Sequence, residues 1–174
     1  MAVTYEPIQT YTATSNVSVI NFSSIPATYD DLILVGNLIS VGNGTDSYMR
    51  FNGSTTGYYR QGYFANGSTI AGNRSLNSAA IQMAFGVVGI NVGFTGQMIS
   101  HIAGYSSTNY ATPVITRGSQ TNHTTAGNYE IAIMSALWNN TSVVNQIQIA
   151  GDSSFSTAAI GTGSVYTLFG IKGA

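Results

Sequence analysis

Apolar and polar residues alternate along much of the chain with the period of two that is typical of β-strands. The segment "VSVINF" over residues 17–22 is an early example, and "VVNQIQIAG" over residues 143–151 is a late one. No segment keeps the i, i+3, i+4, i+7 spacing of an amphipathic helix beyond about one turn. The pattern therefore predicts a chain built from strands.

Two of the predicted strands have apolar residues on both faces. Over residues 129–138, odd positions such as Ile131 and Ile133 form one apolar face. The even positions form the other face and, after Glu130, are all apolar as far as Trp138. Over residues 32–41, "LILVGNLISV", both faces are aliphatic, which is typical of a strand that is covered on both sides. We expect both of these faces to be buried: Leu32, Leu34 and Leu38 on one, and Ile33, Val35 and Ile39 on the other.

Turn residues separate the predicted strands. "GNGTD" over residues 42–46 is one such turn, and Asp30 and Asp31 are expected to form another. About eight to ten strands joined by such turns favour an antiparallel β-sandwich of the jelly-roll type. We expect residues 1–11 to form an N-terminal arm or edge strand, and residues 12–174 to form a single sandwich domain.

The C-terminal segment "VYTLFGIK", residues 165–172, also has two apolar faces. Val165, Thr167, Phe169 and Ile171 share one face, and the even positions share the other. We expect a strand that is paired on both edges or covered on both sides, and that closes the sandwich. Gly170 is expected to mark either a β-bulge or a close approach to the backbone.

Charged residues are scarce, at 6% of the chain against about 25% in an average soluble domain. Five Lys and Arg against six Asp and Glu give a net charge of -1, which cannot form the basic stripe that neutralises phosphates, so nucleic acid is excluded as a partner. The Cys count of 0 excludes disulfides and thiolate metal sites. We expect no signal peptide and no membrane span, because no basic segment precedes an apolar run and no apolar run approaches the length of a membrane helix.

The ionisable residues form no catalytic constellation. Asp30 and Asp31 point to opposite sides of an extended chain, so they cannot share a proton. His101 in a predicted strand and His123 in a polar loop have no local carboxylate partner, and a metal site needs three or four convergent ligands. Glu130 is the only acid in a strong strand. We therefore expect a non-enzymatic protein with no catalytic residues, no metal and no cofactor.

The irregular stretch over residues 53–79 is expected to contain one or two short strands. Within it, "GYYRQGYF" gathers aromatic, arginine and amide side chains. Such a cluster suits either an interface or sandwich core, or contact with a sugar through ring stacking and hydrogen bonds. The candidates for an interface or a glycan contact are Tyr58, Tyr59, Arg60, Tyr63 and Phe64.

Three segments taken together indicate a protein family more specifically than composition does. They are "VSVINFSSIPATYDDLILVGNL", "SALWNNTSVVNQIQIAG" and the ending "YTLFGIKGA". They resemble a group of small virion proteins of tailed bacteriophages, prominent among phages of aquatic cyanobacteria. The resemblance extends from about Val17 to Ala174, and residues 53–79 match only in composition. It implies a β-sandwich that serves as a capsid decoration or cement protein, a head fibre or knob, or a tail-tip module, and it carries over no catalytic residue.

The resemblance leads to a structural protein on the outer surface of a virion. We expect a small homo-oligomer, such as a trimer, that stabilises capsomer contacts, with the major capsid protein as its first partner. Tyr5, Pro7 and Tyr11 are the candidates for a docking arm. The alternative is a tail or head-fibre module that contacts host surface glycans through "GYYRQGYF". A hydrolase would need Glu130 or an Asp and remains a formal alternative.

Overall fold

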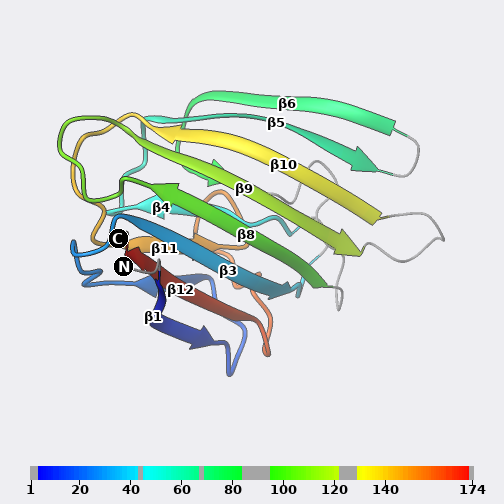
Figure 1. Cartoon of the computed structure of the whole chain (residues 1–174). Coiled ribbons are helices and arrows are strands. Elements are labelled where there is room, and N and C mark those ends of the chain that lie inside the picture. Colours follow the sequence, from blue (N-terminus) through cyan, green and yellow to red (C-terminus); the bar gives the residue numbers. More distant parts are fainter. Residues whose placement is uncertain (1–3, 43–44, 67–68, 84–94, 122–128, 173–174) are drawn as a thin grey trace.

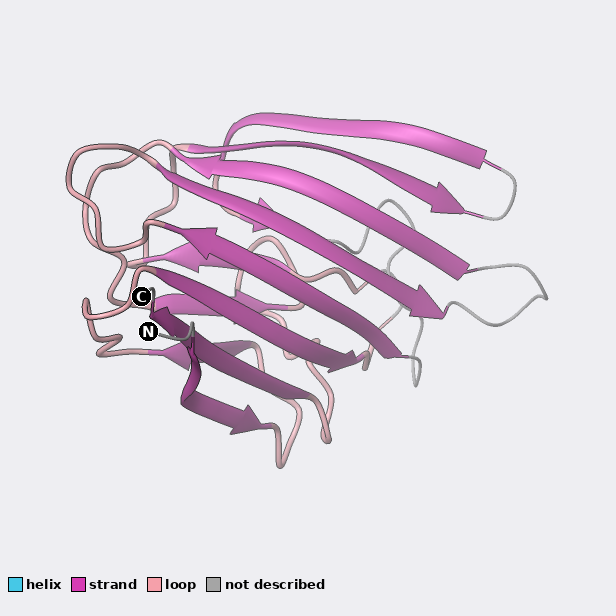
Figure 2. Cartoon of the chain, viewed as in Figure 1, coloured by secondary structure: helices cyan, strands magenta, loops and turns pink. Residues whose placement is uncertain are grey.

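In the computed structural model, residues 4–42, 45–66, 69–83, 95–121 and 129–172 are described, and every regular element within them is a β-strand (Figure 2). The all-β prediction is confirmed. None of the described residues belongs to a helix that is long and apolar enough to cross a membrane. The strands are β1 (Thr4–Thr12), β2 (Val19–Phe22), β3 (Asp31–Ile39), β4 (Tyr48–Phe51), β5 (Tyr58–Asn66), β6 (Thr69–Ser78), β7 (Ile81–Gln82), β8 (Thr95–Ala103), β9 (Thr112–Thr121), β10 (Tyr129–Trp138), β11 (Ile147–Ala150) and β12 (Val165–Lys172).

The strands form two antiparallel sheets that pack face to face, which confirms the predicted β-sandwich (Figure 1). The large sheet has eight strands in the order β1-β12-β3-β8-β9-β10-β5-β6, and the small sheet has four in the order β2-β11-β4-β7. The small sheet covers one face of the large sheet. On the opposite face, which we call the outer face, the described residues place no second layer.

The topology is that of a jelly roll with additional strands. In a jelly roll the strands pair in nested order, the first with the last and so inward. Here β2 pairs with β11, β4 with β7, and β5 with β6. The remaining nested pair, β3 and β10, is separated by β8 and β9, which insert between them. The jelly roll is therefore enlarged on the large sheet alone, by this insertion and by β12 and β1 beside β3.

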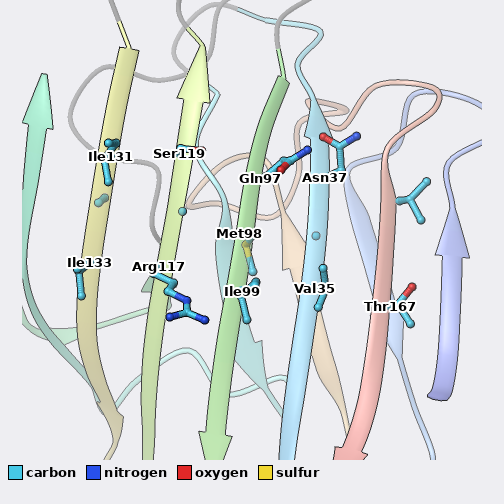
Figure 3. Close-up of a pocket in the computed structure, with 14 residues that line it drawn as sticks. Val35, Asn37, Gln97, Met98, Ile99, Arg117, Ser119, Ile131, Ile133 and Thr167 are labelled. Atoms are coloured by element: carbon cyan, nitrogen blue, oxygen red, sulfur yellow. The ribbon is translucent and has the colours of Figure 1, made fainter. Parts of the chain in front are cut away.

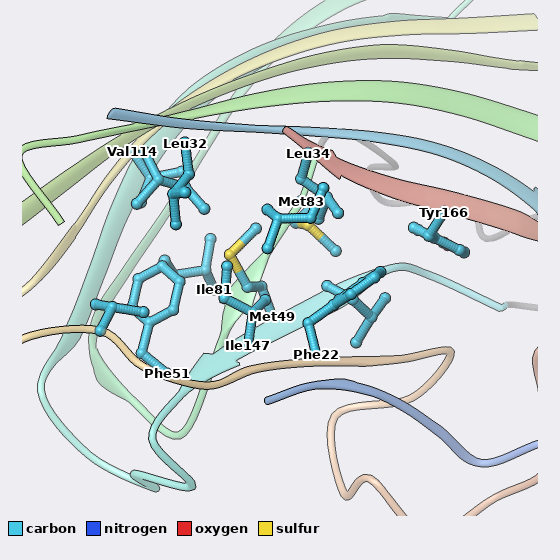
Figure 4. Packing of buried hydrophobic residues seen from close by; sticks show 14 of the residues in the cluster. Phe22, Leu32, Leu34, Met49, Phe51, Ile81, Met83, Val114, Ile147 and Tyr166 are labelled. Atoms are coloured by element: carbon cyan, nitrogen blue, oxygen red, sulfur yellow. The ribbon is translucent and has the colours of Figure 1, made fainter. Parts of the chain in front are cut away.

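The hydrophobic core lies between the two sheets (Figure 4). Its largest aromatic group joins the sheets through Phe51 of β4 and Tyr58 and Trp138 of the large sheet. Trp138 meets Phe51 edge-on at 5.6 Å between ring centroids and stacks on Tyr58 at 6.2 Å. Around them, aliphatic side chains from both sheets are fully buried, including Ile20, Leu32, Leu34, Leu38, Met49, Ile81, Ile147, Ile149 and Leu168.

Residues 53–79 are more regular than the sequence predicts. They contain the long strands β5 and β6, whereas short strands were expected. Gly, Ser and Asn lower the intrinsic strand propensity of this region, but propensity depends on the pairing context. β5 pairs without interruption along β10 from Tyr58 to Asn66, and this partner determines its length.

The C-terminal strand β12 is paired on both edges, with β1 on one side and β3 on the other. This confirms the expectation for residues 165–172. Tyr166 and Leu168 point into the core and are fully buried. Because β12 bridges two strands from the start of the chain, the two ends of the described chain are held together within one sheet.

The prediction that β3 is buried on both faces is wrong for the outer face. Leu32, Leu34 and Leu38 are fully buried against the small sheet, but Val35 on the outer face is 39% exposed. The alternation correctly indicated two apolar faces. Only one of them finds a covering layer among the described residues, so the uncovered face becomes a candidate for function.

Candidate interaction surface

The outer face is built from side chains that line up across the eight strands of the large sheet. The strand registers place one outward residue of every strand in a single row. Directly opposite side chains on neighbouring strands lie close enough to contact each other. This central row runs Thr10, Thr167, Val35, Ile99, Arg117, Ile133, Tyr63 and Gly72.

The outer face is rich in exposed aliphatic side chains. Scattered apolar residues are normal on protein surfaces, but a contiguous patch of them marks an interaction site. The exposed large apolar residues of the described chain fall mainly on this face, on β3, β8, β9, β10, β5 and β6. They are Val35, Ile99, Ile115, Ile131, Ile133, Tyr63, Ile70 and Leu76.

Strand β10 shows the arrangement most clearly. Its outward residues Ile131 and Ile133 are 55% and 58% exposed, whereas the inward Ala132 and Met134 are buried. The bulkier branched side chains of this strand thus face away from the core. Because each isoleucine is only a little over half exposed, it forgoes roughly half of the about 1.5–3 kcal/mol that full burial of such a side chain contributes. That free energy is available to an association that covers the outer face.

A shallow hollow of about 620 Å³ lies on this face across β12, β3, β8, β9 and β10 (Figure 3). Val35, Ile99, Ile131 and Ile133 provide its apolar walls. The inward-facing positions Gly36, Met98, Gly118 and Ala132 contribute backbone to its floor, between the outward side chains. A polar row crosses one end of it, formed by Asn37, Gln97 and Ser119 on adjacent strands.

Among the described residues that line the hollow, Arg117 alone is charged. It lies on β9, directly between Ile99 and Ile133 in the central row. The guanidinium group is a planar multiple donor that suits a carboxylate. The hollow therefore combines apolar walls with one positive group and a row of amide and hydroxyl groups.

A second polar feature of the outer face joins His101 and Asp31. His101 Nε2 lies 2.7 Å from Asp31 Oδ2, and Asp31 Oδ1 accepts a 2.8 Å hydrogen bond from the backbone N–H of Gly104. His101 has no carboxylate partner close in sequence, as expected, but the adjacent strands β3 and β8 bring it to Asp31, which is far away in the sequence. His123 lies outside the described residues.

The predicted aromatic cluster is divided between the two faces of β5. Tyr58, Arg60 and Phe64 turn toward the small sheet, and Tyr59 and Tyr63 turn toward the outer face. Tyr58 is fully buried, and its hydroxyl accepts a 2.7 Å hydrogen bond from the backbone N–H of Phe51. Tyr58 is thus a core residue and not a surface contact. Tyr63 remains exposed, in line with the hollow.

The candidates for a docking arm belong to β1. This strand pairs with β12 from Thr4 to Thr12, with a register shift between Pro7 and Gln9. Tyr5 is largely exposed, but Tyr11 is half-buried and packs against the core. Tyr11 therefore stabilises the sandwich and is not free to dock, whereas Tyr5 and Pro7 lie on the surface.

Asp46 lies in a buried cluster of polar side chains that the sequence analysis did not identify. Its Oδ2 accepts hydrogen bonds from Gln82 Nε2 at 2.7 Å and from the Tyr48 hydroxyl at 3.3 Å. Burial raises the pKa of Asp46 to about 7, against the lowering effect of these two hydrogen bonds and of Arg60. Nearby Glu130 is a buried residue of β10 and adds to the rise.

Among the described residues, no three or more His, Cys, Asp or Glu side chains come together in a group that could hold a metal ion. No protein-family model matches the chain, and no curated protein matches it either.

Proposed function

We propose that this chain is a non-enzymatic structural protein of a tailed-bacteriophage particle, and that its outer face docks on another particle protein. The major capsid protein is the first candidate, with the chain acting as a decoration or cement protein. The observation that carries the proposal is the exposed aliphatic surface of β3, β8, β9 and β10, on which Ile131 and Ile133 of β10 are among the most exposed residues. The segments around Val17, Trp138 and Phe169 resemble small phage virion proteins, and this resemblance supports the proposal that the chain belongs to a phage particle.

The dimensions of the outer face suit a stable contact. Eight strands spaced about 4.8 Å apart, with four outward rows along them, give roughly 800 Å², which is what each partner contributes to a standard interface. The charge pattern of the hollow also restricts the chemistry of the partner's surface. Of the described residues that line the hollow, Arg117 alone carries a charge, so the docked surface would be apolar with a carboxylate opposite Arg117.

The scarcity of charge agrees with an assembled state. With 6% charged residues, the surface offers little electrostatic repulsion between neighbouring copies. Copies repeated around a symmetric particle would each bury an apolar patch, and the sum of modest contacts would hold neighbouring capsomers together.

A second candidate function is contact with a host glycan, and the hollow is the observation that favours it. Asn37, Gln97 and Ser119 offer amide and hydroxyl groups beside apolar walls. Tyr63 is exposed next to Ile133 in the adjacent strand and presents a ring on which a sugar could stack. A tail or head-fibre module would use the same face in this way.

The docking proposal is tested by adding purified chain to particles that lack it and measuring co-sedimentation. The double variant Ile131→Glu/Ile133→Glu should lose at least about tenfold in occupancy, because both carboxylates would be desolvated in the contact, and the one at position 133 would face Arg117 and withdraw it from the partner's carboxylate. The matched control Ile131→Val/Ile133→Val keeps the surface apolar and should bind like the wild type. Unchanged occupancy of the glutamate variant would contradict the proposed face, and absence of wild-type binding would contradict the proposed function.

A glycan array separates the second candidate from the first. If the chain is a receptor-binding module, the wild type binds a defined glycan class, and Tyr63→Ala and Gln97→Ala abolish that binding while occupancy on the particle is retained. If no glycan is bound, the second candidate is wrong.

A further inference from the structure

The two edge strands of the large sheet differ in how they are protected. An edge strand presents unpaired backbone groups, and proteins shield such edges with prolines, bulges or charges. On β1, Pro7 and the register shift between Pro7 and Gln9 interrupt the edge. On β6 the described structure shows pairing with β5 alone, the strand contains no Pro, and its one charged residue, Arg74, turns toward the outer face.

Strand β6 is also regular over most of its length. From Thr69 to Ser75 it pairs residue by residue with β5, and the register shifts only beyond Ser75. There Asn77 adopts a left-handed backbone conformation with φ of 52°. Residues 69–75 thus offer a regular edge for further pairing, and Leu76 is the last residue before the left-handed Asn77.

The outward residues of β6 are Ile70, Gly72, Arg74 and Leu76. Ile70 is 78% exposed and Leu76 is 65% exposed, although both are aliphatic. They lie at equal distances in sequence on either side of Asn73. An antiparallel pair of β6 strands centred on Asn73 would place Ile70 of each copy opposite Leu76 of the other, and Arg74 opposite Gly72.

Other registers lack this complementarity. Opposite residues in an antiparallel pair share a face, so the axis must pass through a residue position and not between two. An axis at Arg74 would set the two arginines against each other, and an axis at Gly72 would set Ile70 against Arg74. Only the axis at Asn73 pairs Ile70 with Leu76, and it sets the two arginines diagonally across the pair, each opposite a glycine, and not directly opposite each other.

We propose that two copies of the chain associate through β6, antiparallel, about a two-fold axis at Asn73. The two large sheets become one continuous sheet, and both outer faces lie on the same side of it. The contact is isologous, as two-fold symmetry requires. Its stability comes from backbone hydrogen bonds between the two edges and from two Ile70–Leu76 contacts. A contact limited to one strand buries less than a standard interface of about 1,600 Å², so the dimer is concentration-dependent, with a Kd of roughly micromolar order.

The axis is tested first by cysteine cross-linking, since the native chain has 0 Cys. Residues directly opposite in an antiparallel pair have Cα atoms about 4.5–5.5 Å apart, which is within the range of a disulfide. Asn73→Cys should therefore form a disulfide-linked dimer under mild oxidation. Gln9→Cys, on the β1 edge, is the matched control and should remain monomeric. Failure of Asn73→Cys to cross-link, or equal cross-linking of both variants, would overturn the proposal.

The register is tested by charge substitution and sedimentation equilibrium. Ile70→Lys should weaken the dimer roughly tenfold or more, because both apolar contacts are lost. Ile70→Lys/Leu76→Glu should restore it, because the introduced lysine of each copy would then face the introduced glutamate of the other. Ile115→Lys, a comparably exposed residue in mid-sheet, should dimerise like the wild type. A wild-type chain that is monomeric at hundreds of micromolar, or a double variant no better than Ile70→Lys, would show the proposal to be wrong.

The dimer is independent of the docking proposal. The variants Ile131→Glu/Ile133→Glu leave β6 unchanged and should dimerise normally in solution, even where they no longer bind particles. The two proposals can therefore fail separately.

Discussion

The ring of Tyr29 lies against the backbone of Gly170, at the position that a β-carbon of residue 170 would occupy. Gly170 pairs in regular register with Glu6 of β1 and Leu32 of β3, so it does not form a bulge. Of the two roles expected for this glycine, the close approach is confirmed. The Tyr29 ring packs on the backbone of β12 at Gly170, where the absence of a side chain leaves room for it.

Replacing Gly170 with alanine should lower the free energy of unfolding by about 1–3 kcal/mol, the usual cost of an overpacked site. The added carbon would meet the Cγ and both Cδ atoms of Tyr29, which lie at the base of the ring and cannot swing away. Gly72→Ala in β6 is the control, because its nearest neighbours would lie at 3.8 Å or beyond. Urea denaturation measures both, and equal stability of the two variants would contradict the packing argument.

The sequence predicted the sandwich because its strongest signal, the alternation in β2, β3, β10, β11 and β12, is local. The extent of β5 and β6 could not be predicted, since their Gly, Ser and Asn residues favour strands only once β10 supplies a partner. The same limit applies to Asp31 and His101. Their contact exists because β3 and β8 are adjacent in the sheet, and no spacing in the sequence indicates that adjacency.

The candidate site could be predicted in part from the sequence. Alternation alone divides "GYYRQGYF" into two sets of side chains on opposite faces of one strand. Which set faces the core depends on the position of the small sheet, so Tyr58 could not be recognised as buried. The outer face had a signal in the second apolar faces of residues 32–41 and 129–138, but an uncovered face and a covered one leave the same pattern in the sequence.

Deletion of Leu168–Ala174 should abolish folding of the soluble chain. Most of β12 would be lost, and with it the pairing to both β1 and β3 and the buried Leu168. Deletion of residues 1–11 is the comparison, because β1 is paired on one edge only; that variant should fold with reduced stability. Circular dichroism and thermal melting distinguish the cases. A C-terminal truncation that melts like the full chain would contradict the role of β12.

Tyr58→Phe should destabilise the core by about 1–3 kcal/mol, the usual cost of an unsatisfied buried polar group. The Tyr58 hydroxyl accepts a hydrogen bond from the Phe51 N–H, and it lies 3.3 Å from the carbonyl oxygens of Phe51 and Ser54. Its removal leaves the buried Phe51 N–H without that acceptor. Tyr63→Phe removes a hydroxyl from an exposed ring and should change the free energy of unfolding by less than about 0.5 kcal/mol. Equal losses in the two variants would show that the hydrogen bond to Phe51 is not what stabilises the core.

Asp46 should make stability depend on pH in a direction opposite to that of most carboxylates. Burial raises its pKa to about 7 in the folded protein, from an ordinary value of 3.8. The folded state therefore keeps the proton over a range in which the unfolded chain has released it. Folding takes up a proton between about pH 4 and pH 7, and the contribution of Asp46 to the free energy of unfolding falls as the pH rises through this window.

Asp46→Asn removes this titration while retaining an oxygen that accepts from Gln82 and Tyr48. Relative to the wild type, the variant should gain stability steadily from pH 4 to pH 7. Asp152→Asn should act in a different pH range, below that of Asp46. Partial burial of Asp152 acts to raise its pKa, but hydrogen bonds from Ser154 and Thr157 outweigh burial and lower it. Its stabilising contribution is therefore complete above the ordinary pKa of 3.8 and is lost as the pH falls below that value, so the deficit of Asp152→Asn should be constant from pH 4 to pH 7 and shrink below pH 4. Urea denaturation at intervals from about pH 3 to pH 7 separates the two behaviours, and parallel profiles for Asp46→Asn and the wild type would show that Asp46 is already ionised in the folded protein.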